Sequence, residues 1–156
     1  MSNEPIYLTA EGAARMREEL AQLKGPQREA LAKRLRAAIQ EGDLSENADY
    51  HKAKEDQGFL EGRIQELEFT LQNATIVEQQ EGRYEVAEVG ARVTIQEEDS
   101  PAETFLLVGA KEADPRNGRI SNESPFGRAL MGGREGDTVV AETPNGEIRL
   151  RILKIE

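Results

Sequence analysis

The sequence predicts an α+β protein, in which a long antiparallel α-helical coiled-coil hairpin precedes a small antiparallel β domain with one short helix. Apolar residues recur every three or four positions through residues 9–73 and every two positions after residue 74. The first stretch is also rich in Ala, Leu, Glu, Gln, Arg and Lys, which favour helix. The change of period predicts two domains, residues 1–76 and 77–156.

The first helix is predicted to begin after Thr9, a good N-cap, and to end at Gly42. Gly25 and Pro26 interrupt its apolar stripe, and they should kink or briefly interrupt the helix because proline lacks an N–H donor and clashes with the preceding turn. The apolar stripe consists of Ala13, Met16, Leu20 and Leu23, and then of Leu31, Leu35 and Ile39.

A second apolar stripe predicts a return helix of about 26 residues. The stripe consists of Leu60, Ile64, Leu67 and Leu71, and Ala53 and Gln57 extend it backwards. Two amphipathic helices joined by a short polar turn bury their stripes on each other, which predicts an antiparallel hairpin.

The second half has the alternation that is typical of half-buried strands. Its alternating apolar residues are Val93 and Ile95, Phe105 and Leu107, and Ile148, Leu150 and Ile152. Residues 144–146 (Pro-Asn-Gly) predict a hairpin turn after a strand at residues 138–140. Ser124 and Pro125 are predicted as the N-cap and first residue of a short helix, which Gly132 and Gly133 end.

Composition excludes several function classes. The chain has 20 Lys and Arg against 30 Asp and Glu, a net charge of −10, and both halves are acidic, so we expect only weak binding to free DNA or RNA. The absence of cysteine excludes disulfides, thiolate zinc sites and a cysteine nucleophile, and a single histidine excludes a two-histidine metal motif. No apolar run approaches the ~20 residues of a membrane span and no signal-peptide pattern is present, so we expect a cytoplasmic protein.

The turn between the two helices, residues 41–51, contains no Lys or Arg. It carries four carboxylates, those of Glu41, Asp43, Glu46 and Asp49. The flanking helices carry a collar of cations, which consists of Lys33, Arg34, Arg36, Lys52 and Lys54. A negative tip with a positive collar suits a site that meets Mg²⁺ and a phosphate chain together. Because Mg²⁺ takes one or two protein carboxylates and leaves its other positions to water and phosphate, Asp43 and Glu46 could complete a site that a partner supplies.

Structural interpretations of the same residues remain open. Asp43 and Glu46 are three apart, so they would share one face at a helical start, and they also fit a capping box at the start of the second helix. The collar fits a solvated helix face. His51 fits a packing or surface residue better than a metal ligand, and Tyr50 fits a contact within the hairpin better than a base-stacking group.

The tip string GDLSENADYHKAKEDQGFLEGRI, followed by ELEFTLQNATIV, resembles the signature of the bacterial Gre transcript cleavage factors. The later strings SPFGRALMGGREGDTVV and TPNGEIRLRILKI resemble the C-terminal part of the same family. The resemblance covers nearly the whole chain. It implies an N-terminal antiparallel coiled coil and an FKBP-like C-terminal domain.

The resemblance also implies a mechanism. The C-terminal domain would dock on the rim of the secondary channel of RNA polymerase, and the coiled coil would enter that channel. Its tip carboxylates would help the polymerase to hold its second Mg²⁺ and to cut backtracked RNA, so that elongation resumes from the new 3′ end. The protein would then be an accessory factor and a monomer, not an enzyme, with no cofactor of its own and with the nascent RNA 3′ end as its nucleic-acid contact.

The resemblance assigns roles to particular positions. The catalytic and Mg²⁺-binding residues would be Asp43 and Glu46. The RNA-contacting collar would consist of Arg36, Lys52 and Lys54, and Ile39 stands where some members carry a basic residue. The tip would be supported by Gly42, Leu44, Ser45, Asn47 and Tyr50.

Four other function classes fit the sequence less well. An inhibitory Gre homologue would occupy the channel without promoting cleavage. Such proteins usually carry an altered, more acidic tip, whereas this chain keeps the Asp-Leu-x-Glu-Asn pattern, which favours cleavage. A channel-binding class with cysteine-bound zinc is excluded by the absence of cysteine. A prolyl isomerase needs an aromatic-lined pocket, and residues 81–156 offer only Tyr84, Phe105 and Phe126. If the protein were only a coiled-coil scaffold, nothing would explain why four carboxylates gather at an exposed turn.

Overall fold

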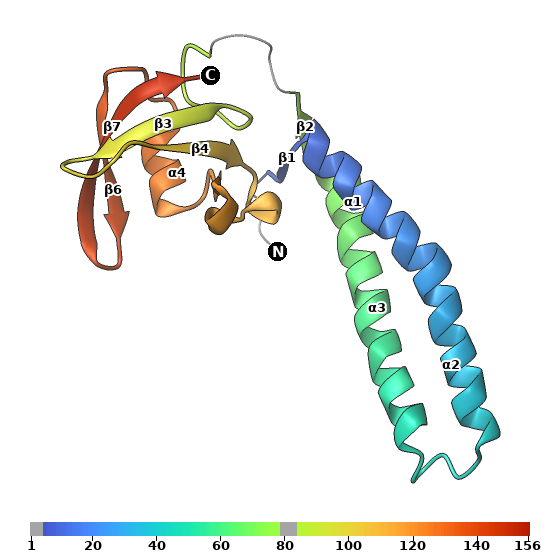
Figure 1. Cartoon of the computed structure of the whole chain (residues 1–156). Helices are drawn as coiled ribbons and strands as arrows, with labels where there is room; N and C mark the ends of the chain where they lie inside the picture. The colour runs from blue at the N-terminus through green and yellow to red at the C-terminus, as the bar shows by residue number, and fades with distance from the viewer. Residues whose placement is uncertain (1–4, 79–83) are drawn as a thin grey trace. The chain divides into compact units, whose positions relative to one another are not determined.

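The computed structural model describes residues 5–78 and 84–156. The chain divides into two compact units. One is the helical hairpin Ala14–Asn73, and the other joins Ala74–Glu156 with the N-terminal segment up to Ala13 (Figure 1). The predicted α+β class is confirmed. Residues 1–4 of the first predicted domain and residues 79–83 of the second lie outside the described residues.

The first arm of the hairpin is helical from α1 (Ala10–Gln22) through the π-helical segment η1 (Leu23–Gln27) to α2 (Arg28–Gln40). Thr9 is the predicted N-cap, since its hydroxyl accepts a hydrogen bond from the Gly12 N–H at 3.0 Å. The predicted disturbance at Gly25 and Pro26 takes the form of a π-helical turn, in which the Arg28 N–H reaches the Leu23 carbonyl. The wider turn accommodates the proline without ending the helix.

The second arm is α3 (Ala48–Asn73), whose 26 residues match the predicted length, and it runs antiparallel beside α2 (Figure 1). The buried core of the hairpin consists of Leu23, Ile64 and Leu67, with Met16, Leu20 and Leu60 packed against it. Nearer the turn the buried positions hold small residues, Ala38 and Ala53. Small side chains let the helices approach each other closely at the end that carries the tip.

The second unit contains a five-stranded sheet in the order β5-β4-β3-β7-β6. All neighbouring strands are antiparallel except β4 and β5, which are parallel. The predicted alternation is confirmed, because Val93, Ile95, Leu150 and Ile152 are buried in its core. The strands are β3 (Arg92–Glu97), β4 (Glu103–Val108), β5 (Arg119–Ser121), β6 (Thr138–Thr143) and β7 (Gly146–Ile155).

Two further local predictions for this unit are confirmed. Helix α4 (Pro125–Leu130) is capped by Ser124, whose hydroxyl accepts from the Gly127 N–H at 3.1 Å. Strands β6 and β7 pair down to Thr143 and Gly146, so Pro144 and Asn145 form the hairpin turn. Two short 3₁₀ segments, η2 (Ala110–Glu112) and η3 (Pro115–Asn117), lie between β4 and β5.

A short parallel pair, β1 (Tyr7–Thr9) with β2 (Thr75–Val77), was not expected from the sequence pattern. The buried Glu112 carboxylate accepts hydrogen bonds from the Thr9 N–H at 2.7 Å and from its hydroxyl at 2.6 Å. A Cβ on Gly109 would lie 1.7 Å from the Tyr7 carbonyl oxygen, so only glycine fits at that position. These contacts place the N-terminal strand in the same compact unit as residues 74–156, whereas the pattern grouped it with the hairpin.

Candidate functional site at the hairpin tip

The tip is a seven-residue connection, residues 41–47, between α2 and α3. Gly42 has φ +78° and Asp43 has φ +45°, so two consecutive residues are left-handed. Glycine adopts this conformation freely and Asp is one of the few other residues that tolerate it. The side chains of residues 41–46 are exposed, which leaves the carboxylates of Asp43 and Glu46 in contact with solvent.

The capping-box interpretation of Asp43 and Glu46 is wrong. Helix α3 begins at Ala48, and the Tyr50 N–H donates to Asn47 Oδ1 at 3.0 Å, so Asn47 is the N-cap. The two left-handed residues delay the start of the helix, and Asp43 and Glu46 therefore lie in the turn that precedes it. Asn47 is itself a strong N-cap type, but residue 50 is not the Glu or Gln that would have marked a capping box there.

The turn brings the predicted tip residues together. The Ser45 hydroxyl donates to Asp43 Oδ1 at 3.1 Å, and the Glu46 N–H donates to the Asp43 carbonyl oxygen at 3.1 Å. The Glu46 side chain has no hydrogen-bond or ion-pair partner among the described residues. Leu44 is exposed. The turn thus holds the Asp43 carboxylate by one hydroxyl and leaves the Glu46 carboxylate free.

Tyr50 and His51 lie at the start of α3. Their rings meet edge to face at 5.6 Å between centroids, and Tyr50 is half-buried. His51 Nε2 lies 3.3 Å from the Ser45 carbonyl oxygen. Both residues therefore make contacts within the hairpin, as the structural interpretation expected.

The collar cations differ in their partners. Asp56 on α3 binds Arg34 across the hairpin at 3.1 Å and Lys52 along its own helix at 3.3 Å. Lys54 donates to Gln57 Oε1 at 3.1 Å. Arg36 is exposed and has no ion pair or hydrogen bond among the residues that the structure describes. Of the three predicted RNA-contacting cations, Arg36 and Lys54 have no acidic partner among the described residues, whereas Lys52 forms an ion pair with Asp56.

Asp56 was not expected from the sequence, although its spacing of four from Lys52 is the signal that marks a helical ion pair. Hydrogen bonds from Arg34, and next from Lys52, hold the pKa of Asp56 below its ordinary value of 3.8. The paired Arg28 guanidinium lowers the pKa of Glu61 below 4.5 in the same way. Both pairs cross from α2 to α3 and connect the arms of the hairpin.

These pairs predict an acid-sensitive hairpin. A carboxyl whose pKa is lower in the folded chain stabilises the fold above its unfolded pKa, and this contribution is lost as the pH falls through the lowered folded value. We expect the melting temperature of the protein to fall as the pH drops below about 4.5, and to fall less steeply in the double variant Asp56→Asn, Glu61→Gln. Both pairs are exposed, so the difference should be small and should shrink in 1 M salt. Thermal unfolding between pH 7 and pH 3 measures it, and equal slopes would contradict the assignment.

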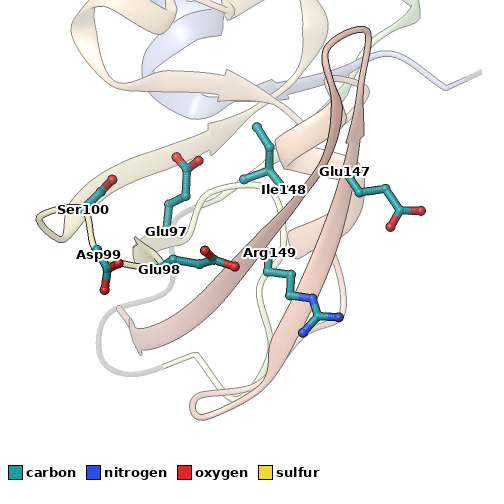
Figure 2. Close-up of a pocket in the computed structure, with 7 residues that line it drawn as sticks. All are labelled: Glu97, Glu98, Asp99, Ser100, Glu147, Ile148 and Arg149. Atoms are coloured by element: carbon teal, nitrogen blue, oxygen red, sulfur yellow. The ribbon is translucent and has the colours of Figure 1, made fainter.

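A separate hollow of about 390 Å³ lies in the second unit beside the turn between β3 and β4 (Figure 2). Figure 2 shows Ile148 and Arg149 projecting to opposite sides of β7, as the alternation of a strand requires. Four acidic residues line the hollow, but neither they nor any other acidic, histidine or cysteine side chains of the described residues form a group of three or more that could hold a metal ion. The hollow is lined by Glu97, Glu98, Asp99, Ser100, Glu147, Ile148 and Arg149.

Comparison with known families covers nearly the entire chain. Residues 6–76 match the family described as transcription elongation factor, N-terminal, and residues 79–156 match the family described as transcription elongation factor, GreA/GreB, C-term. The chain belongs to the GreA/GreB transcription elongation factor family. The resemblance carried by the tip string is thereby confirmed, and so is the predicted role in transcription elongation at the level of the family.

Full-length relatives agree with this membership. The transcription elongation factor GreA of Thermomicrobium roseum is 46% identical over 157 residues, which cover 100% of both chains. The GreA of Chloroflexus aurantiacus is 44% identical over 156 residues and 99% of both chains. Among solved structures, the GreA factor homolog 1 protein of Thermus thermophilus is 28% identical, with 98% of this chain and 99% of that chain covered and a TM-score of 0.44. No helix among the described residues of this GreA/GreB family member is long and apolar enough to cross a membrane.

Proposed function

We propose that this GreA/GreB family protein stimulates the cleavage of backtracked RNA by bacterial RNA polymerase and so rescues arrested elongation complexes. The C-terminal unit docks on the rim of the secondary channel, and the hairpin enters the channel as a monomeric accessory factor. The observation that carries this proposal is that the helix cap and the exposed carboxylates at the tip are different residues. Because Asn47 caps α3, the carboxylates of Asp43 and Glu46 are exposed and not used to hold the helix.

The donor set at the tip fits Mg²⁺. Asp43 and Glu46 offer charged oxygens, which hard cations prefer, and both side chains are accessible. Two carboxylates do not complete the six-oxygen shell of Mg²⁺, so the polymerase has to supply the remaining ligands. When bound there, Mg²⁺ would lower the pKa of water and neutralise charge on the phosphate. The role of the tip is to present Asp43 and Glu46 to that ion inside the polymerase.

The collar cations complete the proposed site. Arg36 and Lys54 are exposed and without an acidic partner among the described residues, so they can contact the phosphates of the extruded RNA inside the complex. Lys52 can contact RNA phosphates in the same way only if its ion pair with Asp56 breaks. The net charge of −10 opposes binding to free RNA, so these contacts depend on the channel that brings RNA and tip together.

A cleavage assay on a stalled, backtracked elongation complex tests this function. We expect the protein to accelerate the shortening of the nascent RNA in the presence of polymerase and Mg²⁺, and to leave the same RNA intact without polymerase. Cleavage of RNA by the protein alone would mean that it is an autonomous enzyme. Slower cleavage in its presence would instead assign it to the inhibitory class, which occupies the channel without promoting the reaction.

A further inference from the structure

Asn47 is the buried polar residue of an otherwise exposed turn, with 9% of its surface exposed. Its carboxamide makes three hydrogen bonds in different directions. Nδ2 donates to the Ala38 carbonyl oxygen at 2.6 Å and to the Gly42 carbonyl oxygen at 3.4 Å, and Oδ1 accepts from the Tyr50 N–H at 3.0 Å. One side chain thus connects the end of α2, the beginning of the turn and the start of α3.

The contact with Gly42 affects the backbone conformation of Asp43. The Gly42 carbonyl belongs to the peptide plane that contains the Asp43 nitrogen, and the φ angle of Asp43 is measured from that plane. Asp43 has φ +45°, a conformation that costs free energy in any residue but glycine, although Asp tolerates it better than most. The Asp43 carbonyl in turn accepts from the Glu46 N–H, so the backbone of Glu46 follows that of Asp43.

We propose that Asn47 is a positioning residue for the tip carboxylates: through the Ala38 and Gly42 carbonyls, it holds the turn in the conformation from which Asp43 and Glu46 reach the polymerase's Mg²⁺. This inference rests on the proposed function. The position requires a donor and an acceptor on one short side chain, and Asn provides both. Asp at this position would still cap α3 but would direct an acceptor at two carbonyl oxygens. Ser would also cap α3 and would not reach Ala38.

The test uses the full-length variants Asn47→Asp and Asn47→Ser in the cleavage assay with backtracked complexes. We expect the maximal cleavage rate to fall about tenfold or more in both, as for the loss of a group that orients a metal ligand. The protein concentration that gives half-maximal stimulation should change less than about twofold, since the docking unit is unaltered. Asn73→Asp is the matched control, because Asn73 also donates to a backbone carbonyl, that of Phe69, at the opposite end of α3. It should behave like the parent.

A double-variant cycle separates positioning from a mere loss of stability. If Asn47 acts through the two carboxylates, Asn47→Ser should cost little further activity in an Asp43→Asn, Glu46→Gln background. Losses that simply multiply would overturn the inference. So would parental cleavage by both Asn47 variants, or a loss that only follows their unfolding at the assay temperature.

Nuclear magnetic resonance of the free protein distinguishes a failure of this inference from a failure of the proposed function. The Asp43 backbone resonances should shift in Asn47→Ser and not in Asn73→Asp. If the parent stimulates no cleavage while these shifts occur, the proposed function is wrong and Asn47 still orders the turn. If the parent stimulates cleavage while the Asp43 resonances stay in place, the positioning role is wrong.

Discussion

Asp43→Asn and Glu46→Gln are expected to lose most of the stimulation of RNA cleavage while keeping the parental fold. An amide is a much poorer ligand for Mg²⁺ than a carboxylate, so the maximal rate should fall by on the order of tenfold to a hundredfold. Raised Mg²⁺ should partly restore it. Asn tolerates the left-handed conformation of residue 43 and can still accept from the Ser45 hydroxyl, and neither carboxylate caps α3. The melting temperatures should therefore match that of the parent.

The other two tip carboxylates provide matched controls. Glu41→Gln and Asp49→Asn remove the same charge from exposed positions, the first residue of the connection and the first turn of α3, and we expect near-parental cleavage from both. Excess Asp43→Asn should still compete with the parent for the polymerase, because it retains the C-terminal unit that we propose docks there. Normal cleavage by Asp43→Asn and Glu46→Gln would show that the carboxylates do not assist the reaction, and the function would then rest on occupying the channel.

Leu67→Ala is expected to destabilise the hairpin by about 2–5 kcal/mol, the usual cost of a large cavity in a core. Leu67 is 1% exposed and lies with Leu23 and Ile64 in the small buried cluster that packs the two arms of the hairpin together, so the cavity would open inside that cluster. Because the tip is carried by these helices, stimulated cleavage should be lost at temperatures where the parent is still active.

Urea unfolding, followed by the helical signal in circular dichroism, measures this cost. Phe59→Ala is the control: a large apolar side chain is shortened on the same hairpin, at a position on α3 that is 69% exposed, and its cost should stay below about 1 kcal/mol. A loss of less than about 1 kcal/mol in Leu67→Ala would mean that the hairpin does not depend on this cluster.

Local patterns determined the secondary structure of this protein. The stripe that includes Ile64 and Leu67 predicted α3, and the alternation through Leu150 and Ile152 predicted the central strand β7, because each period places apolar side chains on one face. The caps at Thr9 and Ser124 were also predictable, since an N-cap acts on a backbone N–H only three residues away. The family resemblance of the tip string supplied the candidate pair Asp43 and Glu46.

The tertiary structure decided what depends on residues distant in sequence. The β1–β2 pair joins segments some seventy residues apart, and the acceptor for Thr9 is Glu112, so no local pattern predicts either contact. The same limit applied to the tip. Asp43 and Asn47 both suit an N-cap, and the choice between them depends on where the returning chain meets α2. Asn47 can donate to the Ala38 carbonyl only after two left-handed residues have reversed the chain. Its Oδ1 accepts from the Tyr50 N–H and caps α3, so neither the Asp43 nor the Glu46 carboxylate is used as the cap.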